Sequence, residues 1–143
     1  MGIIKYYNFE DSEVFIFDEF IINQVKEAVV IEPHHNDIFN EVVQEHFSGK
    51  SMVYISNRVK SYSVNPLIYP EAEKIPNLIA IGIIPKTALM RRNAEYEQKF
   101  FHKPYEIFDN LRDAIVWVHK IMSDTKNNSD SMKEIPDSNL RKF

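Results

Sequence analysis

The sequence predicts an α/β domain with a mixed, mostly parallel sheet of four to six strands and helices packed against it. Three observations support this fold class. Two β-rich runs at the N-terminus indicate an antiparallel hairpin. After them, segments with helical periodicity alternate with short apolar runs, which is typical of crossover connections between parallel strands. Finally, residues 77–84 (NLIAIGII) are almost unbroken in apolar character, which suits a strand covered on both faces.

The hairpin strands are residues 3–9 (IIKYYNF) and 13–20 (EVFIFDEF), which are rich in aromatic and β-branched side chains. The polar residues 10–12 between them supply the turn. Residues 21–31 (IINQVKEAVVI) are expected to add a third strand, with a short helix as the alternative.

A helix is expected to follow Pro33, whose fixed φ suits a first helical turn. Apolar residues then recur at helical spacing up to Phe47, and Gly49 can adopt the left-handed conformation that ends a helix. Residues 52–56 (MVYIS) form the next predicted strand, and residues 65–75 contain at most a short helix.

The last part of the body continues the alternation. Residues 86–101 are helical in composition, and Lys103-Pro104 ends that helix before a short strand at 105–108 (YEIF). Asp109 is predicted to cap a final helix, which has the clearest apolar period of the chain. Its apolar face comprises Leu111, Ala114, Ile115, Val118, Ile121 and Met122.

The chain divides into an ordered domain, residues 1–122, and a polar C-terminal tail, residues 123–143, which is predicted to be disordered. The tail (SDTKNNSDSMKEIPDSNLRKF) mixes four acidic with four basic residues and shows no helical or strand period.

Composition excludes several function classes. The net charge is −4, with 17 basic and 21 acidic residues, so we expect no nucleic-acid partner. The absence of cysteine excludes disulfides, thiolate metal sites and a cysteine nucleophile. No apolar run approaches the ~20 residues of a membrane span, and no signal peptide is evident, so the expected location is cytoplasmic. No cofactor is predicted.

Four stretches resemble the STAS superfamily of anti-sigma-factor-antagonist-like domains, in particular the small bacterial branch grouped with STAS and CRAL-TRIO lipid-exchange domains. They are VYISNRVKSYSVNP (53–66), NLIAIGII (77–84), RNAEYEQKFFHKPYEIF (92–108) and NLRDAIVWV (110–118). The resemblance covers roughly residues 3–120. It implies a mixed sheet of four or five strands with helices against it, and a non-catalytic binding or signalling role.

The resemblance also implies a phosphorylatable serine after the third strand, next to an acidic residue. Here that strand ends on Ser56-Asn57-Arg58, without the acidic neighbour. Ser61 and Ser63 are the candidate phosphorylation sites, although they lie several residues further on.

Physical reasoning points to the same loops. Ligands of open α/β sheets collect beyond the carboxyl ends of parallel strands, so the loops after 52–56 and 78–84 should share one rim. We expect this rim to contact a protein partner or a small anionic ligand. Arg58 and Arg91 would supply charge there, Ser61 and Ser63 hydrogen bonds or a modification point, and Lys86 a cation at a helix start. Ordinary turn and surface roles are the alternative reading of the same residues.

Other functions have weaker support. The sequence has no glycine-rich phosphate loop and no nucleophile motif, so we predict no enzyme activity and no catalytic residues. His34, His35 and His46 lack the spacing of a metal site, and none is predicted. The aromatic residues at 6–20 and 100–117 leave open a carrier of a lipid or small apolar ligand, which is the second functional hypothesis. An exposed aromatic patch also leaves a homodimer open.

Overall fold

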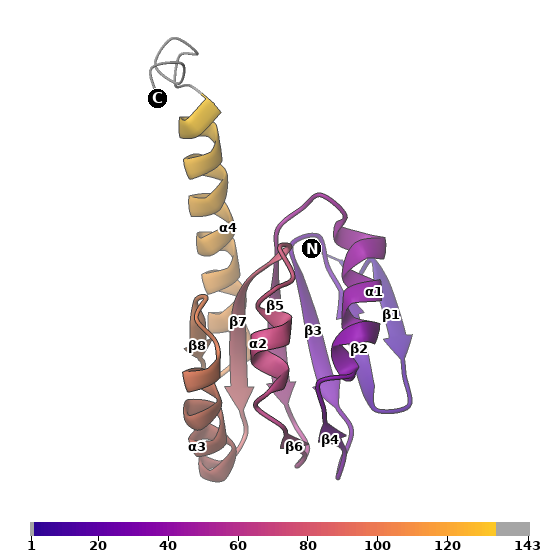
Figure 1. Cartoon of the computed structure of the whole chain (residues 1–143). Coiled ribbons are helices and arrows are strands. Elements are labelled where there is room, and N and C mark those ends of the chain that lie inside the picture. The colour runs from indigo at the N-terminus through magenta and orange to yellow at the C-terminus, as the bar shows by residue number, and fades with distance from the viewer. Residues whose placement is uncertain (1, 134–143) are drawn as a thin grey trace.

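The computed structural model describes the backbone of residues 2–133 and the side chains of residues 2–127. Six strands form one sheet in the order β1-β2-β3-β5-β7-β8 (Figure 1). Their bounds are β1 Lys5–Asn8, β2 Ser12–Ile16, β3 Phe20–Val25, β5 Met52–Arg58, β7 Leu78–Pro85 and β8 Tyr105–Ile107. A separate two-stranded ribbon pairs β4 (Val30–Ile31) with β6 (Ser63–Val64).

The sheet is mixed, as predicted. β1, β2 and β3 pair antiparallel, whereas β3 with β5, β5 with β7, and β7 with β8 all pair parallel. Each parallel step crosses over through a helix, namely α1 (His35–Phe47), α2 (Ile68–Ala72) or α3 (Ala88–Glu97). This arrangement confirms the predicted fold class.

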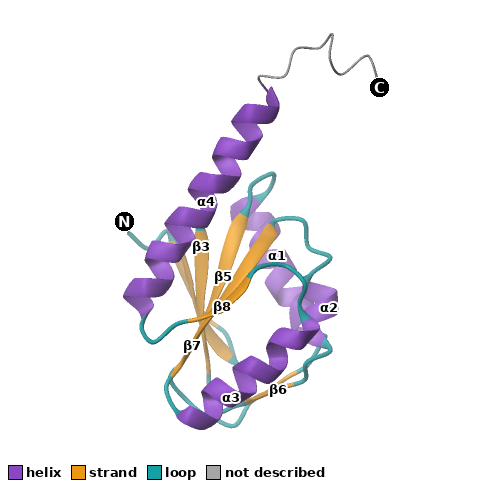
Figure 2. Cartoon of the chain, turned by 90° about the vertical axis from the view of Figure 1, so that its left-hand side faces the viewer, coloured by secondary structure: helices purple, strands orange, loops and turns teal. Residues whose placement is uncertain are grey.

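The helices cover the two faces of the sheet unequally. α1, α2 and α3 pack on one face, and α4 (Leu111–Lys133) covers the other (Figure 2). Side chains alternate along the strands because successive Cβ atoms point to opposite faces. In β5, Met52 and Tyr54 therefore face α1 and α2, while Val53 and Ile55 face α4.

The region 21–31 differs from the single strand that the sequence predicts. β3 ends at Val25, a turn follows in which Ala28 has a positive φ of 64°, and β4 begins at Val30. The short β4 then pairs with β6 and not with the main sheet. The turn places the chain beyond the carboxyl end of β3 before α1 begins.

Capping explains where two of the helices begin. The Thr87 hydroxyl accepts a hydrogen bond of 3.2 Å from the Met90 backbone N–H at the start of α3. At the start of α4, Asn110 Oδ1 accepts from the Asp113 N–H at 2.8 Å. The prediction that Asp109 caps α4 is therefore wrong by one residue, because the Asp109 carboxylate is bound to Arg91 instead.

α4 is longer than the sequence predicts. It continues through Lys133, so the prediction of disorder for 123–143 is corrected for residues 123–133. Residues 134–143 lie outside the described residues. A helix can continue through polar sequence without an apolar period, which is why the composition of this segment did not reveal it. Among residues 2–133, no helix combines the length and apolar character needed to cross a bilayer.

Candidate functional site

The centre of the candidate site is a buried ion pair. Arg58 is the last residue of β5 and Glu97 the last residue of α3, and they are 5% and 4% exposed. The Arg58 guanidinium donates two hydrogen bonds to the Glu97 carboxylate, at 2.9 Å and 2.6 Å. This two-point geometry matches the planar fork of arginine to a carboxylate. The pair joins α3 to the carboxyl end of the sheet.

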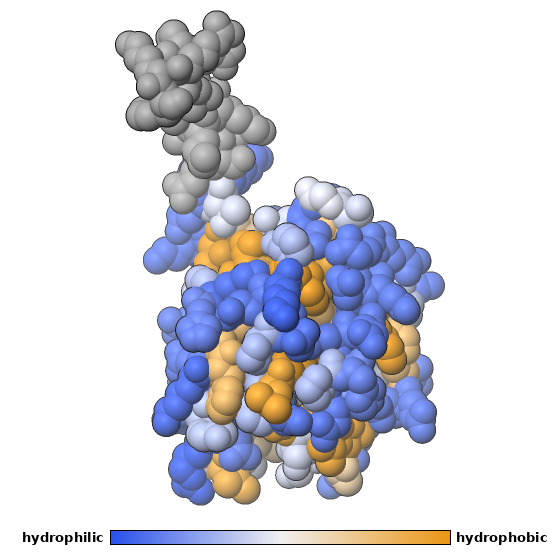
Figure 3. Space-filling view, in the orientation of Figure 1, coloured by the Kyte–Doolittle hydropathy of each residue, from blue (hydrophilic) through white to orange (hydrophobic). Residues whose placement is uncertain are grey.

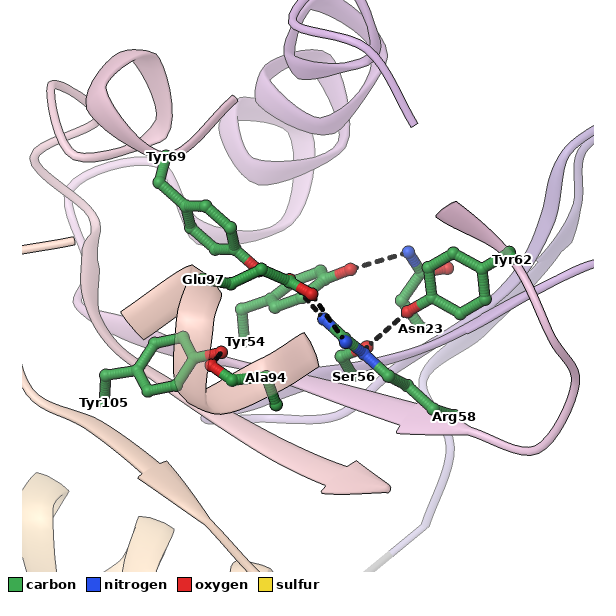
Figure 4. Close-up of polar contacts among 9 residues, drawn as sticks. All are labelled: Asn23, Tyr54, Ser56, Arg58, Tyr62, Tyr69, Ala94, Glu97 and Tyr105. Carbon is green, nitrogen blue, oxygen red and sulfur yellow. Dashed lines mark hydrogen bonds and ion pairs between the residues drawn. The ribbon is translucent and has the colours of Figure 1, made fainter. Parts of the chain in front are cut away.

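Tyrosine hydroxyls complete the network around the pair (Figure 4). The Tyr69 hydroxyl of α2 donates to Glu97, and the Tyr62 and Ser56 hydroxyls share a hydrogen bond of 2.9 Å. The Tyr62 ring also lies 5.4 Å from the Arg58 guanidinium carbon. Burial raises the pKa of both Tyr62 and Tyr69, so both phenols stay protonated at neutral pH.

A second polar pair lies one strand away. Asn23 of β3 donates from Nδ2 to the Tyr54 hydroxyl of β5 at 2.7 Å. Asn23 Oδ1 is buried and has no hydrogen-bond partner in the described part of the chain. An unsatisfied buried acceptor is uncommon in folded proteins and calls for a physical reason.

These polar groups border a cavity of about 390 Å³ between the sheet and helices α1 and α2. Most of the lining is apolar and comes from β2, β3, β5, β7, α1 and α2. The aliphatic and aromatic lining residues include Val14, Ile21, Val25, Phe39, Val42, Ile68, Ala72, Leu78 and Ile81. The polar lining residues near the ion pair are Asn23, Tyr54, Ser56, Arg58, Tyr62 and Tyr69, and those further away are Glu10, Asp11, Ser12, His35 and Asn36.

The lining reaches the surface near the β1–β2 turn and the start of α1. Glu10 and Ile38 line the cavity and are themselves exposed. Next to them, His35 Nε2 lies 2.9 Å from the Asp11 carboxylate. The surrounding surface on this helix-covered side is mainly hydrophilic, with smaller apolar areas between the polar ones (Figure 3). Apart from Arg58 and the tyrosines, the ionisable lining residues are Glu10, Asp11 and His35, and they lie at the outer end of the cavity.

A smaller groove of about 220 Å³ lies on the other side of the ion pair. Arg58, Tyr62 and Val64 line both spaces and so form part of the wall between them. The groove is otherwise bordered by Lys60, Ser63, Met90, Asn93, Tyr96 and Glu97. The polar network is therefore shared by an inner apolar cavity and an outer, more polar groove.

The structure places the two predicted strand ends side by side. β5 and β7 are neighbours, and Arg58 pairs in register with Pro85. Arg58 itself differs from the expectation of a charge available to a partner, because it is buried and its charge is matched by Glu97.

The other predicted residues lie outside the inner cavity. Ser61, Ser63 and Lys86 are exposed, and of these Ser63 borders the outer groove. Arg91 is part-exposed and contacts Asp109 at 2.5 Å. The structure thus brings Arg58 and Ser63 to one groove and leaves Ser61, Lys86 and Arg91 outside both spaces.

Six residues of the site were missed by sequence reasoning: Asn23, Tyr54, Ser56, Tyr62, Tyr69 and Glu97. One signal was present, because Tyr54, Ser56 and Arg58 alternate with Val53 and Ile55 along one strand and so share a face. Glu97 carries no comparable signal, since a glutamate near the end of a polar helix resembles any solvated residue.

The histidines serve local contacts. His35 contacts Asp11 and the backbone of Glu32, and His46 Nε2 lies 2.7 Å from the Tyr7 hydroxyl. No group of three or more His, Asp or Glu side chains in the described residues is arranged to hold a metal ion.

No protein-family model matches the chain, and no curated protein matches it. Among solved structures, it is similar to an uncharacterized protein from the DUF3478 family with a SpoIIAA-like fold from Shewanella loihica PV-4. The two chains share 10% sequence identity, and the match covers 80% of this chain and 90% of that chain with a TM-score of 0.47. At this identity the likeness concerns the fold alone.

Proposed function

We propose that this protein is a non-enzymatic binding module that holds a small, largely apolar molecule in the cavity between its sheet and helices α1 and α2. The cavity itself is the observation that carries the proposal. Its volume of about 390 Å³ and its apolar lining with a few polar groups are characteristic of small-molecule sites.

The hydrophobic effect supports this reading. The cavity opens to the surface near the β1–β2 turn, so its apolar lining is in contact with solvent when no ligand is bound. A ligand of apolar character would remove this lining from water, which is favourable.

The size also limits the ligand. The cavity is near the lower end of the range for small-molecule sites, about 300–1,000 Å³. It suits a compact molecule better than a whole two-chain lipid. This is a narrower version of the apolar-carrier hypothesis that the sequence left open.

Thermal unfolding with compact apolar probes tests the proposal. Naphthalene derivatives should raise the melting temperature, because a ligand that binds the folded state stabilises it in proportion to the logarithm of its concentration over Kd. Ala72→Leu should fill part of the cavity and abolish the rise, since Ala72 lines it. Ala88→Leu is the matched control, because Ala88 is exposed on α3. If no probe raises the melting temperature of the wild type or of Ala88→Leu, the result would argue against a ligand cavity.

A second candidate is a cytoplasmic regulatory module that contacts a protein partner or a small anion through the rim. Its support is the adjacency of the β5 and β7 ends, with Ser61, Ser63 and Lys86 exposed nearby. Lys86 and the part-exposed Arg91 would supply positive charge there. A homodimer through an exposed aromatic patch stays a separate prediction. A phosphate on either serine would add nearly two negative charges.

Mass spectrometry of the protein from its native cells tests this second candidate. A phosphopeptide covering residues 61–63 is expected, and the Ser61→Ala/Ser63→Ala double variant should lose partner capture while its melting temperature stays unchanged. If the double variant captures the partner as well as the wild type does, the two serines are not part of the interface.

A further inference from the structure

We propose that the protein forms a two-fold symmetric dimer in which α4 of each copy packs on the open half of the other copy's sheet. The open half is the part of the α4-side face that β1 and β2 form, with Tyr6, Phe15 and Phe17 as its aromatic residues. This inference is independent of the cavity. It specifies the surface that the sequence-based prediction of a homodimer leaves open.

The open half is apolar and partly uncovered. Val14 and Ile16 of β2 face α1 and α2, so the alternate residues Phe15 and Phe17 lie on the side of α4. Tyr6 of β1 is opposite Phe15, and the centroids of the two rings are 5.1 Å apart. Tyr6 is 44% exposed, and both phenylalanines are part-exposed. Because α4 packs over β5 and β7, it leaves part of these rings in contact with solvent (Figure 1).

Acidic residues border the open half at both ends. Glu13 shares the face of Phe15, and its carboxylate accepts a hydrogen bond of 2.6 Å from the Tyr6 hydroxyl. Asp18 follows Phe17 in the turn to β3 and is exposed. Along this face the chain therefore presents an acidic side chain, two aromatic side chains and a second acidic side chain, in that order.

The outer side of α4 presents the complementary order. Ala114 and Val118 are buried against the sheet, so Val116 between them points away from it and is 62% exposed. Arg112 and Lys120 lie one helical turn before and after Val116, and both are exposed. The outer side of α4 is therefore basic, then apolar, then basic.

β2 and α4 run in the same direction. β2 is antiparallel to β3, and β3, β5, β7 and β8 form the parallel part of the sheet. α4 follows β8 and runs back along the sheet, opposite to β7 (Figure 1). A two-fold axis parallel to the strands preserves these directions. The order along α4 of one copy then matches the order along β2 of the other.

The lengths of the two stretches also agree. Arg112 and Lys120 are eight residues apart on a helix, which is about 12 Å. Glu13 and Asp18 are five residues apart, which is about 17 Å along an extended chain, and long arginine and lysine side chains can span the difference. In the dimer, Val116 lies on the aromatic rings of the other copy. Arg112 then lies near its Glu13 and Lys120 near its Asp18.

The charge of the whole chain favours the same orientation. Residues 1–50, which include the open half, contain three basic and ten acidic residues, whereas residues 51–127 contain eleven basic and eight acidic ones. The proposed contacts bring the acidic part of each copy to α4 in the basic part of the other. Asp113, an acidic residue beside the basic stretch of α4, is hydrogen-bonded to Asn110. Because the two contacts are identical by symmetry, the assembly closes as a dimer.

Sedimentation velocity over a range of protein concentrations tests the inference. The wild type should sediment as a dimer that dissociates on dilution. Val116→Glu should raise the dimer dissociation constant by about tenfold or more, because it places a charge against the aromatic rings of the other copy. Leu89→Glu is the matched control and should keep the wild-type constant, since Leu89 is 59% exposed on α3, on the opposite side of the sheet.

An exchange of charges identifies the paired residues. Lys120→Glu and Asp18→Lys should each weaken the dimer about tenfold, because each variant places like charges opposite one another at both contacts. An equal mixture of the two variants should regain the wild-type affinity as a heterodimer, which native mass spectrometry detects. Both contacts of that heterodimer join opposite charges, and effects within a single chain cannot produce this recovery.

Three results would overturn the proposal. The first is a wild type that stays monomeric at every concentration, and the second is a dimer that Val116→Glu leaves intact. The third is a mixture of Lys120→Glu and Asp18→Lys that forms no more heterodimer than each variant forms homodimer. Because Val116, Lys120 and Asp18 are exposed, all these variants are expected to fold. The proposed binding in the cavity is tested separately, by the melting temperature with apolar probes.

Discussion

Arg58 and Glu97 are 39 residues apart in the sequence, yet they form a two-point ion pair of 2.9 Å and 2.6 Å in the protein interior. The pair connects the end of β5 to the end of α3 and forms part of the wall of both the cavity and the groove. Removing one partner would leave the other as an uncompensated buried charge, which is far more costly than the pair itself.

Arg58→Ala is therefore expected to lower the free energy of unfolding by about 3–5 kcal/mol. Urea denaturation measures this change. Arg91→Ala is the matched control, since its partner Asp109 is 84% exposed and a pair of that kind contributes about 0–1 kcal/mol. Replacing both members, Arg58→Met with Glu97→Leu, should recover much of the loss. Equal effects of Arg58→Ala and Arg91→Ala would contradict the structural role of the buried pair.

The buried tyrosines predict a loss of stability in alkali. Burial raises the pKa of Tyr69 well above its ordinary value near 10, so the folded protein binds this proton more tightly than the unfolded chain does. The resulting stability is complete below pH 10 and decreases as the pH rises further. Urea denaturation at a series of alkaline pH values should show a shallower decrease for Tyr69→Phe than for the wild type. Tyr96→Phe, at an exposed position, should leave the slope unchanged.

Glu73 predicts a change at the acid end. The backbone N–H of His102 donates to its carboxylate at 2.5 Å, and this hydrogen bond lowers the pKa of Glu73 below the usual 4.5. Its contribution to stability is therefore present above pH 4.5 and is lost as the pH falls through the lower folded-state pKa. Glu73→Gln should be less stable than the wild type at neutral pH, and the difference should shrink in acid.

Thermal unfolding of both proteins between neutral and acid pH measures this effect. Glu71→Gln is the control, because Glu71 is exposed and has only a long contact of 3.4 Å with Lys74. If the stability difference between Glu73→Gln and the wild type stays constant with pH, the hydrogen bond has no role in acid stability.

Gly82 lies where β7 meets α4. A Cβ at this position would be 3.3 Å from a Phe108 ring carbon and 3.4 Å from a Trp117 ring carbon, and these two rings already pack with centroids 5.2 Å apart. Gly82→Ala should therefore cost about 1–3 kcal/mol by overpacking, with a change in tryptophan fluorescence. Gly2→Ala, where no atom lies within 4 Å of the added carbon, should have no effect. If Gly82→Ala leaves the free energy of unfolding unchanged, the Phe108 and Trp117 rings can move to accommodate the added carbon without cost.

The sequence carries enough information for the architecture because the signals for it are local. Unbroken apolar runs mark β7, three-and-four spacing marks α1 and α4, and the order of these elements implies the parallel crossovers. The errors fall at positions where local signals are weak. Asn110 caps α4 in place of Asp109, because both residue types can serve and only the position of Arg91 distinguishes them.

The site was less predictable because its main contacts join distant parts of the chain. Arg58 is indicated by its place at a strand end, but its partner Glu97 comes from a helix four elements later, and no local pattern links the two. The cavity depends on how α1 and α2 are spaced from the sheet, which is a property of the packed structure. The burial of Asn23 Oδ1 without a partner is likewise a property of the packed structure that no sequence pattern indicates.

Side chains along β5 alternate between the two faces of the sheet, so adjacent residues have different roles. Val53 and Ile55 pack in the hydrophobic core beneath α4, while Tyr54 and Ser56 line the inner cavity on the opposite face of the sheet. Substitutions at Tyr54 and Ser56 can therefore change the lining of the cavity while the core beneath α4 stays intact. Natural or laboratory selection could accordingly change which molecule the cavity binds without changing the fold.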